Sequence, residues 1–213
     1  MILQPPVKIL IATHNRGKIR EVHDQLHSLP VKLLYLSEFP LVSTVAELGK
    51  TYRENAVLKA LGYARQTGLC ALADDSGLEV DALAGAPGVH SARFGDENSS
   101  DRDRNQALLA KISDKGDARR DASFICCMAL AGWQVAPGAG EPQLLTVTEA
   151  KCDGSIALHA RGTNGFGFDP LFIPDGYAVT FAELPAEVKA KISHRAQALA
   201  AVRAFISCWM TLT

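Results

Sequence analysis

The chain has 213 residues, of which 47% are hydrophobic and 21% are charged, and its formal net charge is −1. This length supports one α/β domain with a substantial core, and the near-neutral balance provides no basic field to attract nucleic acid or an anionic membrane. The five cysteines, an odd number without a C-x-x-C pair, indicate buried thiols in a reducing compartment. The opening MILQPPVKILIAT has no basic segment and no long apolar run, so we expect a cytoplasmic protein without a membrane span.

The beginning of the chain predicts a strand, a polar loop, a helix and a second strand. The apolar run at 7–12 is typical of a buried strand, and Ile19, Val22 and Leu26 then recur at helical spacing. A second strand is expected at 31–36. This order is the opening unit of many nucleotide-binding α/β proteins.

A well-delimited helix is expected at 51–67, followed by two strands. Thr51 and Glu54 form a capping box, and Gly68 is placed to end the helix. The run at 69–73 predicts a strand that ends on Asp74 and Asp75. The alternation over 78–83 then predicts an edge or half-exposed strand.

The second half of the chain predicts paired strands and a helical end. A short helix is expected at 101–112, and strands at 123–133 and 143–152 are joined by the Pro/Gly-rich APGAGEPQ. A glycine-rich loop at 161–170 precedes a short apolar segment at 171–173. Pro185 and Ser193 are placed to begin the last two helices. We find no repeat or linker, and we expect a single domain over 1–213.

The segment THNRGK, residues 13–18, lies where the first strand gives way to a helix. It is not a P-loop, since G-x-x-x-x-G-K-[ST] is absent. It nevertheless places a hydroxyl, an amide, a glycine and a lysine at a helix N-terminus, which attracts phosphate and disfavours a cation. Phosphate binding is therefore favoured over a merely solvated polar turn.

A second cationic cluster is expected at Ser193-His194-Arg195, with Lys189 one turn earlier. His194 and Arg195 open a helix at the end where positive charge is disfavoured, and an anionic ligand would reverse that cost. A solvated cap region explains the same residues equally well.

Acidic residues flank the strand at 69–73. Hard cations such as Mg²⁺ take oxygen ligands, commonly one or two carboxylates plus substrate phosphates, which makes Glu47, Asp74 and Asp75 candidates. Glu54 is already explained by its capping box, and Asp74 to Gly77 could form an ordinary Asx turn. If the strand continues, alternation lets only one of Asp74 and Asp75 face a given site, and the sequence does not choose between them.

The loop GTNGFGFDP combines flexible backbone with flat apolar side chains. Gly165 and Gly167 permit close approach of the backbone, and Phe166 and Phe168 could stack on a purine. Phenylalanines are nevertheless more often part of the core than base platforms.

Five stretches in this order closely resemble one known family: ATHNRGK, ELGKTYRENAVLKA, ADDSGLEVDALAGAPGVHSARF, GFGFDPLF and ISHRAQAL. The chain resembles the inosine/xanthosine triphosphate pyrophosphatases over residues from about 9 to 199. The resemblance implies an α/β fold with a long central mixed β-sheet and flanking helices, forming two lobes around an active-site cleft. It also implies a homodimer that uses Mg²⁺ to hydrolyse ITP, dITP and XTP to the monophosphate and pyrophosphate.

The resemblance also assigns site residues. Glu47 and Asp75 would bind the metal, and Asp75 would accept the proton of the attacking water. The substrate would contact Thr13, His14, Asn15, Arg16, Gly17, Lys18, Ser76, Phe166, Gly167, Phe168, Asp169, Lys189, His194 and Arg195. Lys59 matches a position that assists phosphate contacts, and the role of Asp74 stays open.

The departures from the family pattern are few. His14 stands where many members have Gly, Phe168 where Tyr or Trp is common, and Ala196 where Gly is frequent. Two rival functions stay open: a pyrophosphatase for other modified nucleotides, as in the related septum-associated family, and a non-catalytic nucleotide-binding module. GFGFDP and SHRAQAL favour the purine enzymes over the first, and the Glu47/Asp75 pair argues against the second.

Overall fold

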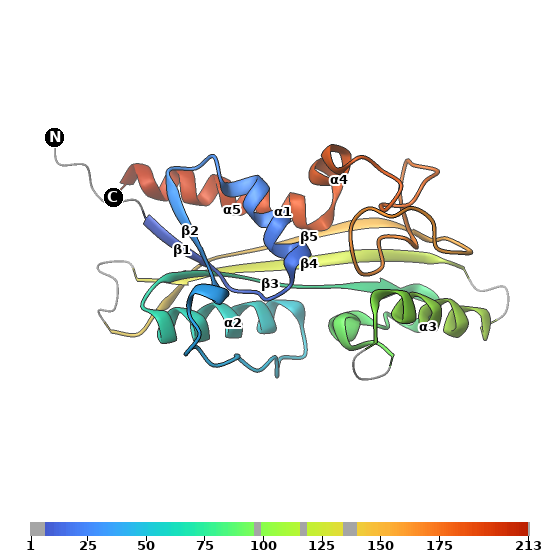
Figure 1. Cartoon of the computed structure of the whole chain (residues 1–213), viewed down its shortest axis with the longest axis horizontal. Coiled ribbons are helices and arrows are strands. Elements are labelled where there is room, and N and C mark those ends of the chain that lie inside the picture. Colours follow the sequence, from blue (N-terminus) through green and yellow to red (C-terminus); the bar gives the residue numbers. More distant parts are fainter. Residues whose placement is uncertain (1–6, 96–98, 116–118, 134–139, 213) are drawn as a thin grey trace. The chain divides into compact units, whose positions relative to one another are not determined.

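One mixed sheet runs through the chain (Figure 1). The computed structural model describes residues 7–95, 99–115, 119–133 and 140–212. Within these ranges, six strands follow the order β2-β1-β3-β4-β5-β6. They are β1 (Val7–Ile11), β2 (Val31–Tyr35), β3 (Cys70–Val80), β4 (Asp121–Gly132), β5 (Gln143–Ile156) and β6 (Phe172–Pro174). β1 is parallel to β2 and β3, whereas β5 and β6 are antiparallel, so the expected α/β fold with a mixed central sheet is confirmed.

The helices begin and end where the sequence places its caps. They are α1 (Arg16–Leu26), α2 (Tyr52–Thr67), α3 (Asp101–Ser113), α4 (Ala186–Ile192) and α5 (His194–Leu212). Thr51 and Glu54 form the predicted capping box, and Gly68 ends α2 with a φ of 68°. The Ser193 hydroxyl accepts the Ala196 N–H at 3.1 Å at the start of α5.

The chain divides into two compact units. Unit 1 comprises Met1–Asp75, Cys127–Glu149 and Ala198–Thr213, and unit 2 comprises Ser76–Cys126 and Ala150–Gln197. Strands β3, β4 and β5 each pass from one unit into the other. The division into units leaves the expected single domain over 1–213 a prediction.

Unit 1 is built on β1 and the first part of β3. Ile9, Leu10 and Ile11 are fully buried, and Figure 1 shows α1 and the later part of α5 on one side of these strands and α2 on the other. An Arg203 guanidinium N–H donates to the Gln25 carbonyl at 2.6 Å and joins α5 to α1.

Unit 2 has a separate aromatic core. Phe124, Phe168, Phe172 and Phe181 lie in one buried cluster with Leu78 and aliphatic side chains from α3 and the strands. The ring centroids of Phe124 and Phe172 are 4.7 Å apart. This core supports the loop that carries the predicted base-binding residues.

The segment around Asp74 and Asp75 corrects one prediction. We expected a strand at 69–73, a turn or strand end, and an edge or half-exposed strand at 78–83. β3 is instead one strand from Cys70 to Val80 between β1 and β4, and Leu78 and Val80 are fully buried. The strand continues through two carboxylates because both find cationic partners, so no turn is needed to bring them to solvent.

Other expectations concern the cysteines and the termini. All five cysteines are free thiols, as predicted, but only four of them are buried and Cys208 is exposed. Across the described residues, no helix has the length and apolar character needed to cross a membrane. The opening MILQPP and the first half of the APGAGEPQ connection lie outside the described residues.

Candidate active site

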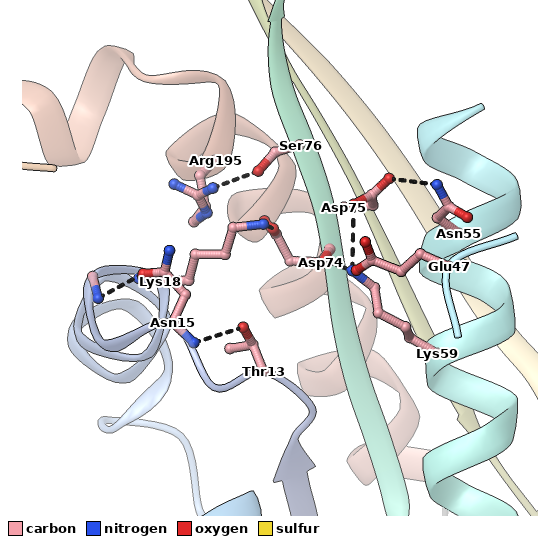
Figure 2. Close-up of polar contacts among 11 residues, drawn as sticks. Thr13, Asn15, Lys18, Glu47, Asn55, Lys59, Asp74, Asp75, Ser76 and Arg195 are labelled. Carbon is pink, nitrogen blue, oxygen red and sulfur yellow. Dashed lines mark hydrogen bonds and ion pairs between the residues drawn. The ribbon is translucent and has the colours of Figure 1, made fainter. Parts of the chain in front are cut away.

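Asp74 and Asp75 point to opposite sides of β3 (Figure 2). The Asp74 carboxylate forms an ion pair with Lys18, at the start of α1. The Asp75 carboxylate instead contacts Lys59 and Asn55, both on α2. Strand alternation therefore turns the two aspartates to different sides, as the sequence predicts for a continuous strand, and the structure shows that each meets a different helix.

Lys59 is the centre of an acidic cluster in unit 1. Its ammonium Nζ lies 2.6 Å from Glu47 Oε1 and 3.3 Å from Asp75 Oδ1, and it donates to the Asp74 carbonyl at 2.7 Å. Only 8% of Lys59 and 5% of Asp75 is exposed, so these charges lie largely away from water. Two carboxylates from separate segments therefore converge on one point.

Burial and the neighbouring charges shift the pKa values of Asp75 and Lys59 in opposite directions. Burial raises the pKa of the Asp75 carboxyl above its ordinary value, and the ammonium groups of Lys59 and Lys18 oppose this shift without cancelling it. Burial alone would lower the pKa of Lys59, but the carboxylates of Asp75 and Glu47 outweigh it and the pKa is raised. Asp75 is thus a better proton acceptor than a solvated carboxylate, held beside a firmly charged lysine.

The oxygen atoms of Glu47 and Asp75 fit a hard divalent cation. They already approach a single cationic atom, and carboxylate oxygens are the ligands that Mg²⁺ prefers. In the described part of the chain, no three His, Cys, Asp or Glu side chains gather into a metal cage. A metal here would need oxygens from phosphate and water besides the two carboxylates, which is the usual situation for Mg²⁺.

The predicted phosphate loop forms the start of α1. The Asn15 side chain accepts the N–H groups of Gly17 at 2.9 Å and Lys18 at 3.1 Å, and the Asn15 N–H donates to the Thr13 hydroxyl at 3.2 Å. Asn15 thus caps the helix and occupies two of its free N–H groups. His14 and Arg16 are exposed.

The cationic helix start of α5 lies in unit 2. An Arg195 guanidinium N–H donates to the Ser76 hydroxyl at 2.7 Å. The His194 ring stacks on Phe124, with centroids 4.6 Å apart and an interplanar angle of 7°. Both residues are nearly fully buried, at 3% exposure for His194 and 2% for Arg195, so the solvated-cap alternative is excluded.

Phe166 lies beside two cations. The Lys189 Nζ is 4.8 Å from the centroid of its ring, and the Arg195 guanidinium carbon is 5.6 Å away. Asp169 pairs with Lys189 at 2.5 Å and also accepts the Phe166 N–H at 2.8 Å. Asp169 therefore fixes both the ring and one of the cations beside it.

Gly167 and Phe168 are held by other parts of unit 2. The Gly167 N–H donates to Asp101 at 2.7 Å, and its carbonyl accepts from the Asn105 amide at 3.0 Å. Phe168 is only 4% exposed and meets Phe94 edge-on at 6.3 Å. Of the two phenylalanines, Phe168 is a core residue, whereas Phe166 is half-buried.

The two compact units divide the predicted residues into two sets. Unit 1 holds Thr13, His14, Asn15, Arg16, Gly17, Lys18, Glu47 and Asp75, and unit 2 holds Ser76, Phe166, Gly167, Phe168, Asp169, Lys189, His194 and Arg195. Asp75 and Ser76 are consecutive residues of β3, and the boundary between the two units falls between them.

Sequence reasoning missed three supporting residues. Asn55 contacts Asp75, Phe124 stacks on His194, and Asn105 holds Gly167. Lys59 was expected to contact phosphate but lies among carboxylates. The Asn55–Lys59 spacing of one helical turn, beside two unexplained acids, was the available signal for the unit 1 contacts.

The comparisons with known proteins cover almost the whole chain. Residues 9–205 match the model of the Ham1 family. A protein of Syntrophobacter fumaroxidans named dITP/XTP pyrophosphatase is 48% identical over 191 residues, which cover 90% of this chain and 78% of that protein. A Geobacter sulfurreducens protein of the same name is 45% identical, covering 92% of this chain and 94% of its own length.

A solved structure has the same fold. The HAM1 protein from Coxiella burnetii superposes with a TM-score of 0.83 at 39% sequence identity. The match covers 94% of this chain and 98% of that one.

Proposed function

Because this chain belongs to the Ham1 family, we propose that it hydrolyses non-standard purine nucleoside triphosphates. The substrates are ITP, dITP and XTP, and the products are the nucleoside monophosphate and pyrophosphate. The reaction removes these nucleotides from the nucleotide pool. The near-full-length similarity to proteins named dITP/XTP pyrophosphatase supports this assignment.

The single observation that carries the chemistry is the convergence of Glu47 and Asp75 on the same point beside β3. A protein that only bound nucleotide would need cationic donors but not this carboxylate pair, one member of which, Asp75, is buried at a cost in free energy. We assign Asp75 as the proton acceptor for the attacking water, following the family resemblance, since it is a buried carboxylate held in place by Lys59 and Asn55.

Glu47 and Asp75 would hold Mg²⁺, which neutralises charge on the phosphates when bound. Lys18 and the loop at the start of α1 bind the triphosphate, with the lysine ammonium as the cationic donor. Lys59 holds the two carboxylates together before substrate arrives and stays charged, as its raised pKa requires. The water attacks the α-phosphorus, and its proton passes to Asp75.

We propose that the purine and the sugar contact the predicted site residues of unit 2. Phe166 offers a ring face, and Ser76, Lys189, His194 and Arg195 offer hydroxyl, ammonium, imidazole and guanidinium groups. Buried donors of this kind match the 6-oxo group of hypoxanthine or xanthine, and an adenine amino group would leave them unpaired.

We propose a cytoplasmic homodimer as the working form, following the family resemblance. Light scattering on the purified protein tests the assembly: a mass near twice 22.8 kDa is expected, and a monomer contradicts it.

A substrate panel tests the proposed function. Purified protein is incubated with Mg²⁺ and each of ITP, dITP, XTP, ATP and GTP, and pyrophosphate is measured separately from orthophosphate. We expect pyrophosphate from the first three at rates far above those for ATP and GTP. Orthophosphate as the primary product, or equal turnover of ATP, would refute the proposal.

A further inference from the structure

Asn55 connects two segments that carry the carboxylates of the candidate active site. Its side-chain amide donates to Asp75 Oδ2 at 3.1 Å, and its side-chain oxygen accepts the Gly49 N–H at 2.8 Å. Asn55 is only 3% exposed and lies in the first turn of α2. One amide therefore bridges β3 and the loop that bears Glu47 (Figure 2 shows its contact with Asp75).

The contact with Asp75 fixes the rotation of its carboxylate. The terminal torsion of an aspartate is broad, so the carboxylate plane needs partners to hold it. The Asn55 amide donates to Oδ2, while Oδ1 lies 3.3 Å from the Lys59 ammonium. The two carboxylate oxygens of Asp75 thus have different partners. The hydrogen bond from Asn55 to Oδ2 sets the direction in which Oδ1 points, toward Lys59 and Glu47.

The contact with Gly49 fixes the loop. A Cβ at position 49 would lie 2.6 Å from Glu54 Cβ and 2.8 Å from Asn55 Oδ1, so the close approach needs glycine. The neighbouring Glu54 carboxylate accepts the N–H groups of Lys50 at 2.6 Å and Thr51 at 3.2 Å. Asn55 and Glu54 together hold the loop just beyond Glu47, but only Asn55 also reaches Asp75.

We propose that Asn55 is a positioning residue that sets the orientation of Asp75 and its separation from Glu47. The proposal rests on the proposed function, in which Asp75 accepts the proton of the attacking water. Asn55 acts through Asp75 and the loop at Gly49, which are its two side-chain contacts named above. Its effect falls on turnover, because the groups that bind the nucleotide are elsewhere.

Two substitutions separate the two contacts. Asn55→Asp is isosteric and keeps an oxygen for the Gly49 N–H, but it loses the donor to Asp75. Asn55→Ala loses both contacts. Glu54→Gln is the matched control, since an amide oxygen still accepts the loop N–H groups and no contact with Asp75 is altered.

The expected kinetic result is a loss in kcat of about 10- to 100-fold for both Asn55 variants, as for other residues that orient ligating groups, with KM for dITP changed less than about threefold. Glu54→Gln is expected to stay within about twofold of the unmodified protein. Thermal unfolding establishes that each variant is folded at the assay temperature. Folded Asn55→Asp with unchanged kcat would overturn the proposal, and so would a rise in KM without a fall in kcat.

Hydrogen exchange gives a readout that needs no activity. The Gly49 amide is expected to exchange at least about tenfold faster in Asn55→Ala, and to stay protected in Asn55→Asp. A crystal structure of Asn55→Asp is expected to show a rotated Asp75 carboxylate. If the unmodified protein releases no pyrophosphate, the proposed function fails. An unmoved Asp75 in Asn55→Asp, or unchanged exchange in Asn55→Ala, overturns the positioning role even then.

Discussion

Asp74 and Asp75 are consecutive residues of β3, yet each is paired with a lysine from a different helix. Asp74 pairs with Lys18 at the start of α1, and Asp75 lies 3.3 Å from Lys59 on α2. The pleat of the strand separates two adjacent carboxylates and assigns them different partners. This separation leaves Asp74 paired with Lys18, the lysine proposed to bind phosphate, and Asp75 in the position proposed for the proton acceptor.

Amide substitutions at the two aspartates are predicted to differ in their effects. Asp75→Asn removes the proton acceptor, and kcat is expected to fall by about 10²- to 10⁴-fold with nucleotide binding retained. Burial raises the pKa of Asp75 above its value in the unfolded chain, so keeping Asp75 ionised at neutral pH costs stability, and the amide is expected not to lower the free energy of unfolding in metal-free buffer. Steady-state kinetics and urea unfolding measure both effects. Full activity in Asp75→Asn would show that the assignment is wrong.

Asp74→Asn is expected to act mainly through Lys18. Losing a charged hydrogen bond in a mostly buried pair is expected to cost about 1–3 kcal/mol of stability. Lys18 loses the partner that orients it, so KM for dITP is expected to rise while kcat falls much less than in Asp75→Asn. Equal kinetic losses in the two variants would contradict separate roles.

Alanine substitutions at Phe166 and Phe168 form a second matched pair of variants. Phe168→Ala opens the aromatic core of unit 2 and is expected to cost about 3–5 kcal/mol of stability. Phe166 is half-buried beside Lys189 and Arg195, so Phe166→Ala is expected to leave stability within about 1 kcal/mol and to raise KM about tenfold through lost stacking. Urea unfolding and kinetics with dITP distinguish them. A large stability loss at Phe166 with unchanged KM would reverse the assignment of the two rings.

Lys59→Met tests whether Glu47 and Asp75 form a cation site. Removing Lys59 is expected to cost about 3–5 kcal/mol, because the buried Asp75 carboxylate and the partly exposed Glu47 carboxylate are left without their ammonium. Added Mg²⁺ is expected to raise the Tm of this variant more than that of the unmodified protein. In the same buffers, EDTA is expected to abolish pyrophosphate release by the unmodified enzyme, and Mg²⁺ to restore it. A Tm in Lys59→Met that does not respond to Mg²⁺ would argue against metal binding by this carboxylate pair.

Local features of the fold were predictable from the sequence. The capping box of Thr51 and Glu54, the end of α2 at Gly68 and the Ser193 cap of α5 each depend on residues within one helical turn. The alternation that separates Asp74 from Asp75 is equally local. Each of these features follows from backbone geometry that a few neighbouring residues determine.

The partners of the site residues were not predictable in the same way. Whether β3 continues through Asp74 and Asp75 depends on lysines from two helices, and the stacking of His194 on Phe124 joins a helix to a distant strand. Such contacts are set by tertiary packing, which propensity and spacing do not encode. The family resemblance supplied the site residues, but only the structure places Lys59 among carboxylates and Asn55 against Asp75.

Hydrolysis of dITP in ¹⁸O-labelled water tests the central claim most directly. Mass spectrometry of the products shows which phosphorus the water attacks. If Asp75 activates water against the α-phosphorus, one ¹⁸O atom per turnover appears in dIMP and none in pyrophosphate. Label in pyrophosphate or in orthophosphate, with dIMP unlabelled, would contradict the account.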